Sequence, residues 1–223
     1  MAHREPSTPA GSAETDPRPA VVTFVTTEHF TLQGARSSTI AEATGRASMF
    51  LGAISGGLVA LGLIASAAKV GAAFYAFGLI LLPTLTFVGL VTFDRVLQSG
   101  IEDYGYALRI ARLRGYYFRY APELVDYLLS VPPAERLRMQ GMRGGAWQPF
   151  LTIAGMVAVI TAVLGGSAVG LLAAVVSGHS LVAALVTGVL VAGAALAGLM
   201  RYERSAWRQV RTAPEYAGEQ VGE

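Results

Sequence analysis

The sequence predicts an all-α polytopic membrane protein, with four transmembrane helices in two hairpins and cytoplasmic helical extensions. Hydrophobic residues make up 53% of the 223-residue chain and charged residues only 14%, whereas ordinary globular domains are about 25% charged. The mean hydropathy is +0.49. Four apolar stretches of 20 to 27 residues contain no Asp, Glu, Lys or Arg. Because about 20 such residues suffice to cross a bilayer, these stretches dictate the fold class.

The chain begins with a segment that predicts no folded structure. Its first twenty residues include four prolines among Ser, Thr, Gly and mixed charges, without the apolar core of a signal peptide. We therefore expect residues 1–26 to be a disordered leader. Thr26 or Thr27 is expected to cap a helix, and no helix-breaking residue separates this helix from the first span. A lone strand over Val21–Thr27 is the alternative, because these residues are β-branched and aromatic.

The first hairpin joins two spans through a tight connection. The spans are Ser48–Ala68 and Ala72–Phe93. The second is expected to continue as helix towards Tyr120, so that residues 27–120 form a hairpin with a cytoplasmic stalk. Residues 121–147, which are rich in proline and glycine, are expected to form a helical connector.

The second hairpin, residues 148–200, contains the remaining spans, Phe150–Val176 and Leu181–Met200. The third span is long for one crossing, so it either tilts or bends at Gly165-Gly166. Residues 201–223 are expected to form a basic juxtamembrane helix and tail.

The arginines predict the orientation. Sixteen of the seventeen basic residues lie before the first span, between the second and third, or after the fourth. Because cytoplasmic segments carry the excess of Lys and Arg, both termini and the middle segment are expected in the cytoplasm. The two short connections, which contain Lys69 and His179, are then on the other side.

The first and third spans contain small residues four positions apart, and the second span contains a proline. Gly52 and Gly56 lie on one face of the first span, as Gly166 and Gly170 do in the third. Such faces allow close helix approach, either within the chain or between copies in a homo-oligomer. Pro83 predicts a kink in the second span, which is either fixed by neighbouring helices or a hinge that exposes carbonyls to a pore.

Two arginine clusters are candidate contacts. Arginines at spacings of three, four and three share one helical face after the fourth span, where anionic lipid headgroups are expected to bind: Arg201, Arg204, Arg208 and Arg211. The other cluster is interleaved with aromatic residues: Arg109, Arg112, Arg114 and Arg119. It is either a solvated basic face or a contact for a lipid headgroup, a nucleotide signal or a cytoplasmic protein. The net charge of +2 does not favour nucleic acid as a partner.

The composition excludes several kinds of chemistry. The chain has no cysteine, and its three histidines, His3, His29 and His179, are far apart. Disulfides, thiolate sites and a histidine-based metal site are therefore not expected. Acids such as Glu102-Asp103 are expected to be solvated. We find no motif of a hydrolase or nucleotide-binding loop, and no ionisable group of the kind that membrane pumps keep within a span. We expect no catalytic residues, no metal, no cofactor and no enzymatic activity.

Residues 28–52 (EHFTLQGARSSTIAEATGRASMFLG) and 107–124 (ALRIARLRGYYFRYAPEL) resemble segments of uncharacterised four-span membrane proteins of actinobacteria. The layout is also similar to that of small transmembrane effectors of bacterial nucleotide-signalling defence systems. In those effectors a cytoplasmic module senses a signal and the membrane part disrupts the bilayer. The resemblance implies a location in the bacterial plasma membrane.

Three functions are consistent with these patterns. The first is a non-enzymatic integral membrane protein whose cytoplasmic helices bind a partner or one another. The alternative is an oligomeric pore-forming or membrane-permeabilising effector that is gated through its cytoplasmic segment. A more distant third is a small channel or carrier for an uncharged solute.

Overall fold

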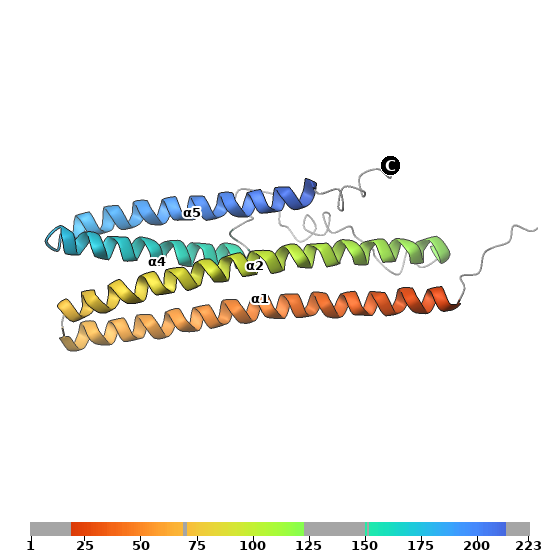
Figure 1. Cartoon of the computed structure of the whole chain (residues 1–223), viewed down its shortest axis with the longest axis horizontal. Coiled ribbons are helices and arrows are strands. Elements are labelled where there is room, and N and C mark those ends of the chain that lie inside the picture. The colour runs from red at the N-terminus through yellow and green to blue at the C-terminus, as the bar shows by residue number, and fades with distance from the viewer. Residues whose placement is uncertain (1–18, 69–70, 123–149, 151, 213–223) are drawn as a thin grey trace, which may run out of the picture.

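The computed structural model describes residues 19–68, 71–122, 150 and 152–212. These residues form four long helices: α1 (Pro19–Ala68), α2 (Ala72–Tyr120), α4 (Ile153–Val176) and α5 (Leu181–Thr212) (Figure 1). The described part of the chain contains no strand, so the all-α fold class is confirmed. Each helix is also long and apolar enough to cross a membrane, which is the architecture of a multi-pass membrane protein.

Helix α1 starts earlier than the sequence predicts. It begins at Pro19 and is continuous over 50 residues, about 75 Å at 1.5 Å per residue. The expected disordered leader 1–26 is therefore wrong for its last eight residues, and the alternative strand over Val21–Thr27 is also wrong. Proline suits the first turn of a helix because its missing N–H needs no partner there. The Thr23 and Thr27 hydroxyls donate to carbonyls four residues earlier, at 3.0 and 2.9 Å.

Helix α2 continues far beyond its apolar part, as expected. It runs for 49 residues from Ala72 to Tyr120. It remains helical on both sides of Pro83, whose side chain is exposed. The stretch 123–149, which includes nearly all of the expected connector, lies outside the described residues.

Helix α4 is shorter than the predicted span. It starts at Ile153 rather than Phe150, because the Thr152 side chain caps it by accepting a hydrogen bond of 2.8 Å from the Gly155 amide. Its 24 residues extend about 36 Å, close to the hydrocarbon thickness of a bilayer. The helix is continuous through Gly165 and Gly166.

The turn between α4 and α5 is tight. Gly178 and His179 both have a positive φ, 68° and 73°. The left-handed region is easily reached by glycine and rarely by other residues. The His179 ring stacks edge-on against Tyr75 at a centroid distance of 5.0 Å. This contact places the turn beside the start of α2.

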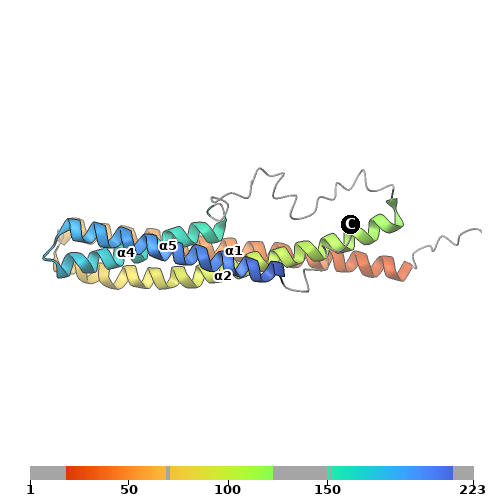
Figure 2. The ribbon, with the colours of Figure 1, turned by 90° about the horizontal axis from the view of Figure 1, so that it is seen from above.

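The four helices pack as a row. Helix α1 packs along α2, α2 along α4, and α4 along α5, whereas α1 and α5 are the outer members (Figures 1 and 2). At one end α1 and α2 continue beyond the other two helices. We call this part, residues 19–35 and 104–120, the two-helix extension.

The core lies where α1, α2 and α4 meet. Phe50 and Phe93 are 2% exposed, and Val157 and Ala158 of the same cluster are fully buried. Gly89 lets the helices approach closely there, because a side chain at this position would collide with Thr161 and Phe50. This core positions α1 and α5 with their outer faces uncovered.

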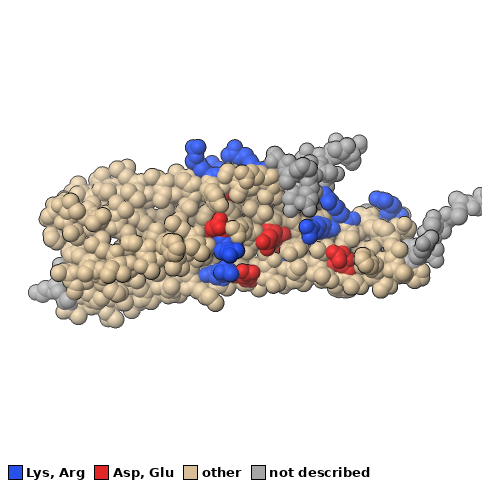
Figure 3. Space-filling model, viewed as in Figure 1, with Lys and Arg blue, Asp and Glu red and all other residues tan. Residues whose placement is uncertain are grey.

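Charge divides the molecule along its length. On the face shown in Figure 3, the described Lys and Arg (blue) and Asp and Glu (red) occur from the middle of the molecule towards the two-helix extension, and the end at the left of the view has none. The half that contains this end exposes large apolar side chains, for example Met49, Ile80 and Val176 at 78%, 71% and 80%. A soluble protein rarely exposes so large an apolar surface.

Candidate functional site

The arginines after the fourth span lie on a continuation of α5. The predicted juxtamembrane helix and the apolar stretch before it therefore form one helix, α5, which ends at Thr212. Arg201, Arg204 and Arg208 are exposed and share one face by their spacing, whereas the Arg211 side chain lies outside the described part. Contact of this face with lipid headgroups stays a prediction.

The arginines of α2 do not all share one face. Arg109, Arg112 and Arg119 are exposed, and their spacings of three and seven residues put them on one side. Arg114 is half-buried and lies close to His29 of α1. Burial, and secondly the charge of Arg114, lower the pKa of His29. The His29 ring also stacks edge-on against Tyr117, with centroids 6.2 Å apart. Arg114 and Tyr117 therefore belong to the contact between α1 and α2.

The two glycine pairs behave differently. A Cβ atom at Gly166 would lie 2.6 Å from the Ala192 Cβ atom, and one at Gly170 would lie 2.7 Å from the Ala184 carbonyl oxygen. This pair therefore packs α4 against α5 within the chain. In contrast, a Cβ atom at Gly52 or Gly56 would meet nothing within 4 Å. The glycine that packs α1 onto α2 is Gly57, beside Leu81 and Leu85.

Gly52 of α1 belongs to a longer pattern, which was not predicted from the sequence. Small residues, and one valine, recur at alternating spacings of four and three along the side of α1 opposite its buried residues, which include Leu32, Ala43 and Phe50. We call this the α1 seam: Thr27, Thr31, Gly34, Ser38, Ala41, Gly45, Ser48, Gly52, Ser55, Val59, Gly62 and Ser66. All are exposed except Gly45, which is half-buried, and none is charged. The spacing is present in the sequence, but the length of α1 and its uncovered side are needed to show that these residues form one continuous exposed strip.

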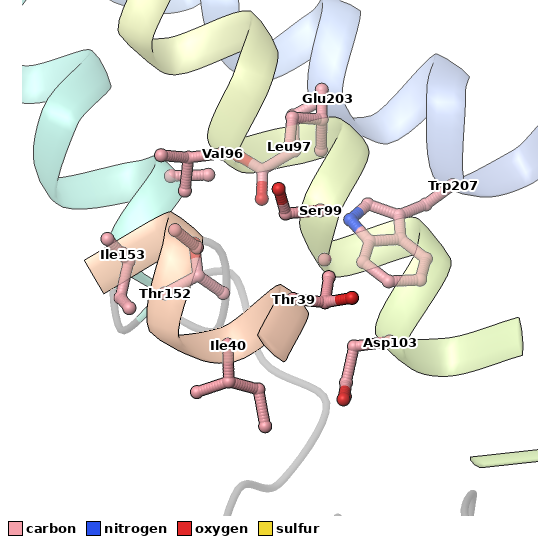
Figure 4. Close-up of a pocket in the computed structure, with 13 residues that line it drawn as sticks. Thr39, Ile40, Val96, Leu97, Ser99, Asp103, Thr152, Ile153, Glu203 and Trp207 are labelled. Atoms are coloured by element: carbon pink, nitrogen blue, oxygen red, sulfur yellow. The ribbon is translucent and has the colours of Figure 1, made fainter. Parts of the chain in front are cut away.

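A pocket lies where the four helices meet, at the boundary between the apolar and the charged halves (Figure 4). Its volume is about 190 Å³ and its lining is mainly apolar. We call it the junction pocket. Helices α1, α2 and α5 each contribute at least one polar or aromatic side chain, and Thr152, which caps α4, contributes another. The lining includes Thr39 of α1, Ser99 and Asp103 of α2, and Glu203 and Trp207 of α5.

Glu203 is the most unusual group of the junction pocket. It lies within the arginine-rich end of α5 but on the side opposite the arginines, and it is only 3% exposed. Its Oε2 atom has no hydrogen-bond partner. Burial raises the pKa of this carboxyl, against smaller lowering effects of a hydrogen bond with Thr152 and of the Arg204 charge. The arginine spacing in the sequence predicts a basic face only, so this acid was not expected to form part of a site.

Three other polar side chains of the junction pocket already have hydrogen-bond partners within the chain. The Thr39 hydroxyl donates to the Ala35 carbonyl, and the Ser99 hydroxyl to the Arg95 carbonyl, each at 3.0 Å. Asp103 accepts two bonds from Arg36 of α1, at 2.7 and 3.2 Å. The expectation that Asp103 is merely solvated is therefore wrong, because this partly buried ion pair ties α1 to α2.

Comparisons with protein-family models, curated proteins and solved structures find no match. Among the described residues no group of three or more His, Asp or Glu side chains could hold a metal ion. The arrangement instead offers three surfaces: the basic face of α5, the uncharged α1 seam, and the junction pocket.

Proposed function

We propose that the chain is a non-enzymatic membrane protein of the bacterial plasma membrane whose copies associate in parallel through the α1 seam. The observation that carries this proposal is the uncharged seam itself, which follows α1 from its apolar half into the two-helix extension. In this proposal the four apolar segments cross the bilayer as two hairpins. The extension, the arginine clusters and both termini are in the cytoplasm, in agreement with the positive-inside rule.

The first support is the absence of charge where water would surround the helix. Thr27, Thr31, Gly34, Ser38 and Ala41 lie in the charged half of the molecule and are exposed. A solvent-facing helix surface normally carries charged residues. Charges occur just beside the seam, for example in the Glu42–Arg46 ion pair at 2.8 Å, but not on it. An uncharged strip between such flanks indicates a surface that another helix covers.

The second support concerns the covering helix, which we propose is another copy of α1. All copies in one membrane have the same orientation, so a symmetric pair of α1 helices is parallel and each seam residue meets its own counterpart. A charge at the seam would then face the same charge. The alternating spacing of three and four residues is the repeat that keeps two parallel helices in contact over many turns. Because small residues let backbones approach closely in lipid, this repeat suits both halves of α1.

A substitution at the seam tests the proposal. Gly52→Leu places a large side chain on the seam, and the folded monomer has room for it because a Cβ atom there meets nothing within 4 Å. We expect this variant to be monomeric when single molecules are counted by stepwise photobleaching in nanodiscs, whereas the wild type is oligomeric. Ala53→Leu is the matched control, because Ala53 is also exposed but lies off the seam. A wild type that is monomeric, or a Gly52→Leu variant that associates as the wild type does, would contradict the proposal.

The oligomeric pore remains the alternative. The specific observation in its favour is that Ser48, Ser55 and Ser66 provide hydroxyl groups along the membrane part of the seam. A ring of more than two α1 helices would direct these groups to a common axis, which the uncharged spans of one copy do not provide. Leakage of a small dye from liposomes, lost in Gly52→Leu and kept in Ala53→Leu, would favour the pore. Tight liposomes at densities where the protein is oligomeric would exclude it.

A further inference from the structure

We infer that the junction pocket binds a primary ammonium group that is carried on a small apolar body. The inference starts from the uncovered Oε2 atom of Glu203, which is buried and faces a cavity rather than a partner. A buried polar atom without a hydrogen bond destabilises the folded state, and more so if it is charged. A ligand that supplies a positively charged donor would remove this cost.

The neighbouring hydroxyls make the pocket selective for a donor. Because Thr39 and Ser99 donate their hydrogens to helix carbonyls, only their oxygen lone pairs remain for a ligand. The Thr152 hydroxyl is likewise engaged, since its oxygen accepts from the Gly155 amide and it is hydrogen-bonded to Glu203. An ammonium group offers three N–H donors and no acceptor. It therefore complements a set of acceptors that an anion or a carbonyl compound does not.

Of the acids that line the junction pocket, Glu203 is the one that would bind the ammonium group. The two acids that line the pocket are Glu203 and Asp103, but Arg36 already neutralises Asp103 at 2.7 Å. Arg204, although next to Glu203 in sequence, is exposed and makes no ion pair with it. One uncompensated carboxylate matches one monovalent cation.

The size and lining of the pocket favour an organic cation over a metal ion. Its volume of about 190 Å³ is somewhat larger than an apolar cavity of about 150 Å³ that takes up benzene. The walls are formed by aliphatic residues such as Ile40, Val96 and Ile153, together with the Trp207 indole, and an indole face attracts cations. In Figure 4, Glu203 and Trp207 extend from α5, and Thr39 extends towards Trp207 from α1. The carboxylate would hold the ammonium group while the apolar walls cover its body.

Two sources of this chemistry are a soluble amine and the headgroup of an aminophospholipid. The pocket lies at the boundary of the apolar half, because Glu203 follows the last apolar residue of the predicted fourth span, Met200, by three positions. A primary ammonium group reaches this depth either from the water or from the headgroup layer. The experiment therefore needs an arm for each source.

The test uses the full chain in phosphatidylcholine nanodiscs at pH 8, in a Trp147→Phe background, so that Trp207 is the only indole that responds. Phenethylamine is titrated while Trp207 fluorescence is recorded, and calorimetry gives an independent dissociation constant. We expect saturable binding, with 2-phenylethanol at least tenfold weaker because it lacks the charge. In a second arm, phosphatidylethanolamine replaces part of the phosphatidylcholine. A weaker apparent affinity for phenethylamine there assigns the site to the lipid headgroup, and an unchanged affinity assigns it to a soluble amine.

Glu203→Gln keeps the shape of the side chain and removes its charge, so we expect at least a tenfold loss of phenethylamine affinity. Glu42→Gln, which alters an exposed acid of α1 away from the pocket, should bind as the wild type does. The comparison between amine and alcohol needs only the wild type, and hence remains valid if Glu203→Gln does not fold. Equal binding of amine and alcohol, no binding of either, or displacement of the amine by millimolar K⁺ or Na⁺ would overturn the inference. None of these results depends on whether the α1 seam joins two copies.

Discussion

Replacing Gly166 with alanine should separate α4 from α5. The new Cβ atom would lie 2.6 Å from the Ala192 Cβ atom, where carbon atoms prefer separations of about 3.5–4.0 Å, and it would also press on the Gly188 carbonyl oxygen. The helices must therefore move apart by about 1 Å. Overpacking of this kind costs about 1–3 kcal/mol. Alanine also stabilises a helix relative to glycine by about 1 kcal/mol. The control is therefore a second Gly→Ala variant that has this helix stabilisation but no close contact.

Gly193→Ala supplies that control, since Gly193 is on α5 and a Cβ atom there meets nothing within 4 Å. The free energy of unfolding of both variants can be measured in mixed micelles by titration with SDS. We expect Gly166→Ala to be less stable than Gly193→Ala by about 1–3 kcal/mol. Equal stabilities of the two variants would refute the close packing of α4 on α5.

Three further predictions concern orientation, lipid binding and Glu203. With cysteine introduced singly into this cysteine-free chain, an impermeant thiol reagent should label His179→Cys but not Ser38→Cys in intact cells; the reverse pattern would invert the proposed topology. Changing Arg201, Arg204 and Arg208 together to glutamine should reduce the phosphatidylglycerol that copurifies with the protein, because each basic residue near an anionic surface contributes about 1 kcal/mol; unchanged lipid content would refute a headgroup contact. Burial raises the pKa of Glu203. Between the ordinary and the raised pKa the folded state therefore binds more protons than the unfolded state. The contribution of Glu203 to the free energy of unfolding falls as the pH rises through that window. Glu203→Gln should remove that part of the pH dependence and unfold at a higher temperature at pH 7; a lower unfolding temperature would show that the carboxylate is well compensated.

The helices and many of their limits could be predicted from the sequence, because the signals are local. Uncharged stretches reveal apolar segments, and the absence of breakers allowed α2 to be followed to Tyr120. The ends at Ala68, Ala72 and Leu181 were also predictable, since polar residues, glycine or serine lie next to them. The start of α1 was not predictable, because β-branched residues such as Val21 and Val22 favour strands only where a second strand is available, and none is present among the described helices.

The candidate sites were less predictable, because they depend on which side of each helix is covered. Gly52 and Gly166 occupy similar motifs, yet only Gly166 contacts another helix of the chain. The sequence places Glu203 among four arginines as one more charge. The packing of the end of α5 beside α4 and α2 buries it in the pocket that Ser99 and Thr39 also line. Arg114 is half-buried and Arg112 is exposed for the same reason, because α1 covers only one side of this part of α2.

A cysteine scan along α1 tests the central claim, parallel association through the seam, most directly. Single cysteines at Ser38, Ala41 and Ser48 sample the seam, and cysteines at Gln33 and Ala53 sample exposed positions outside it. Disulfides form only where the two Cα atoms come within about 7 Å. In oxidised native membranes we expect dimers linked at the three seam positions and few at the other two. Equal crosslinking at all five positions, or crosslinking at Gln33 and Ala53 alone, would contradict it.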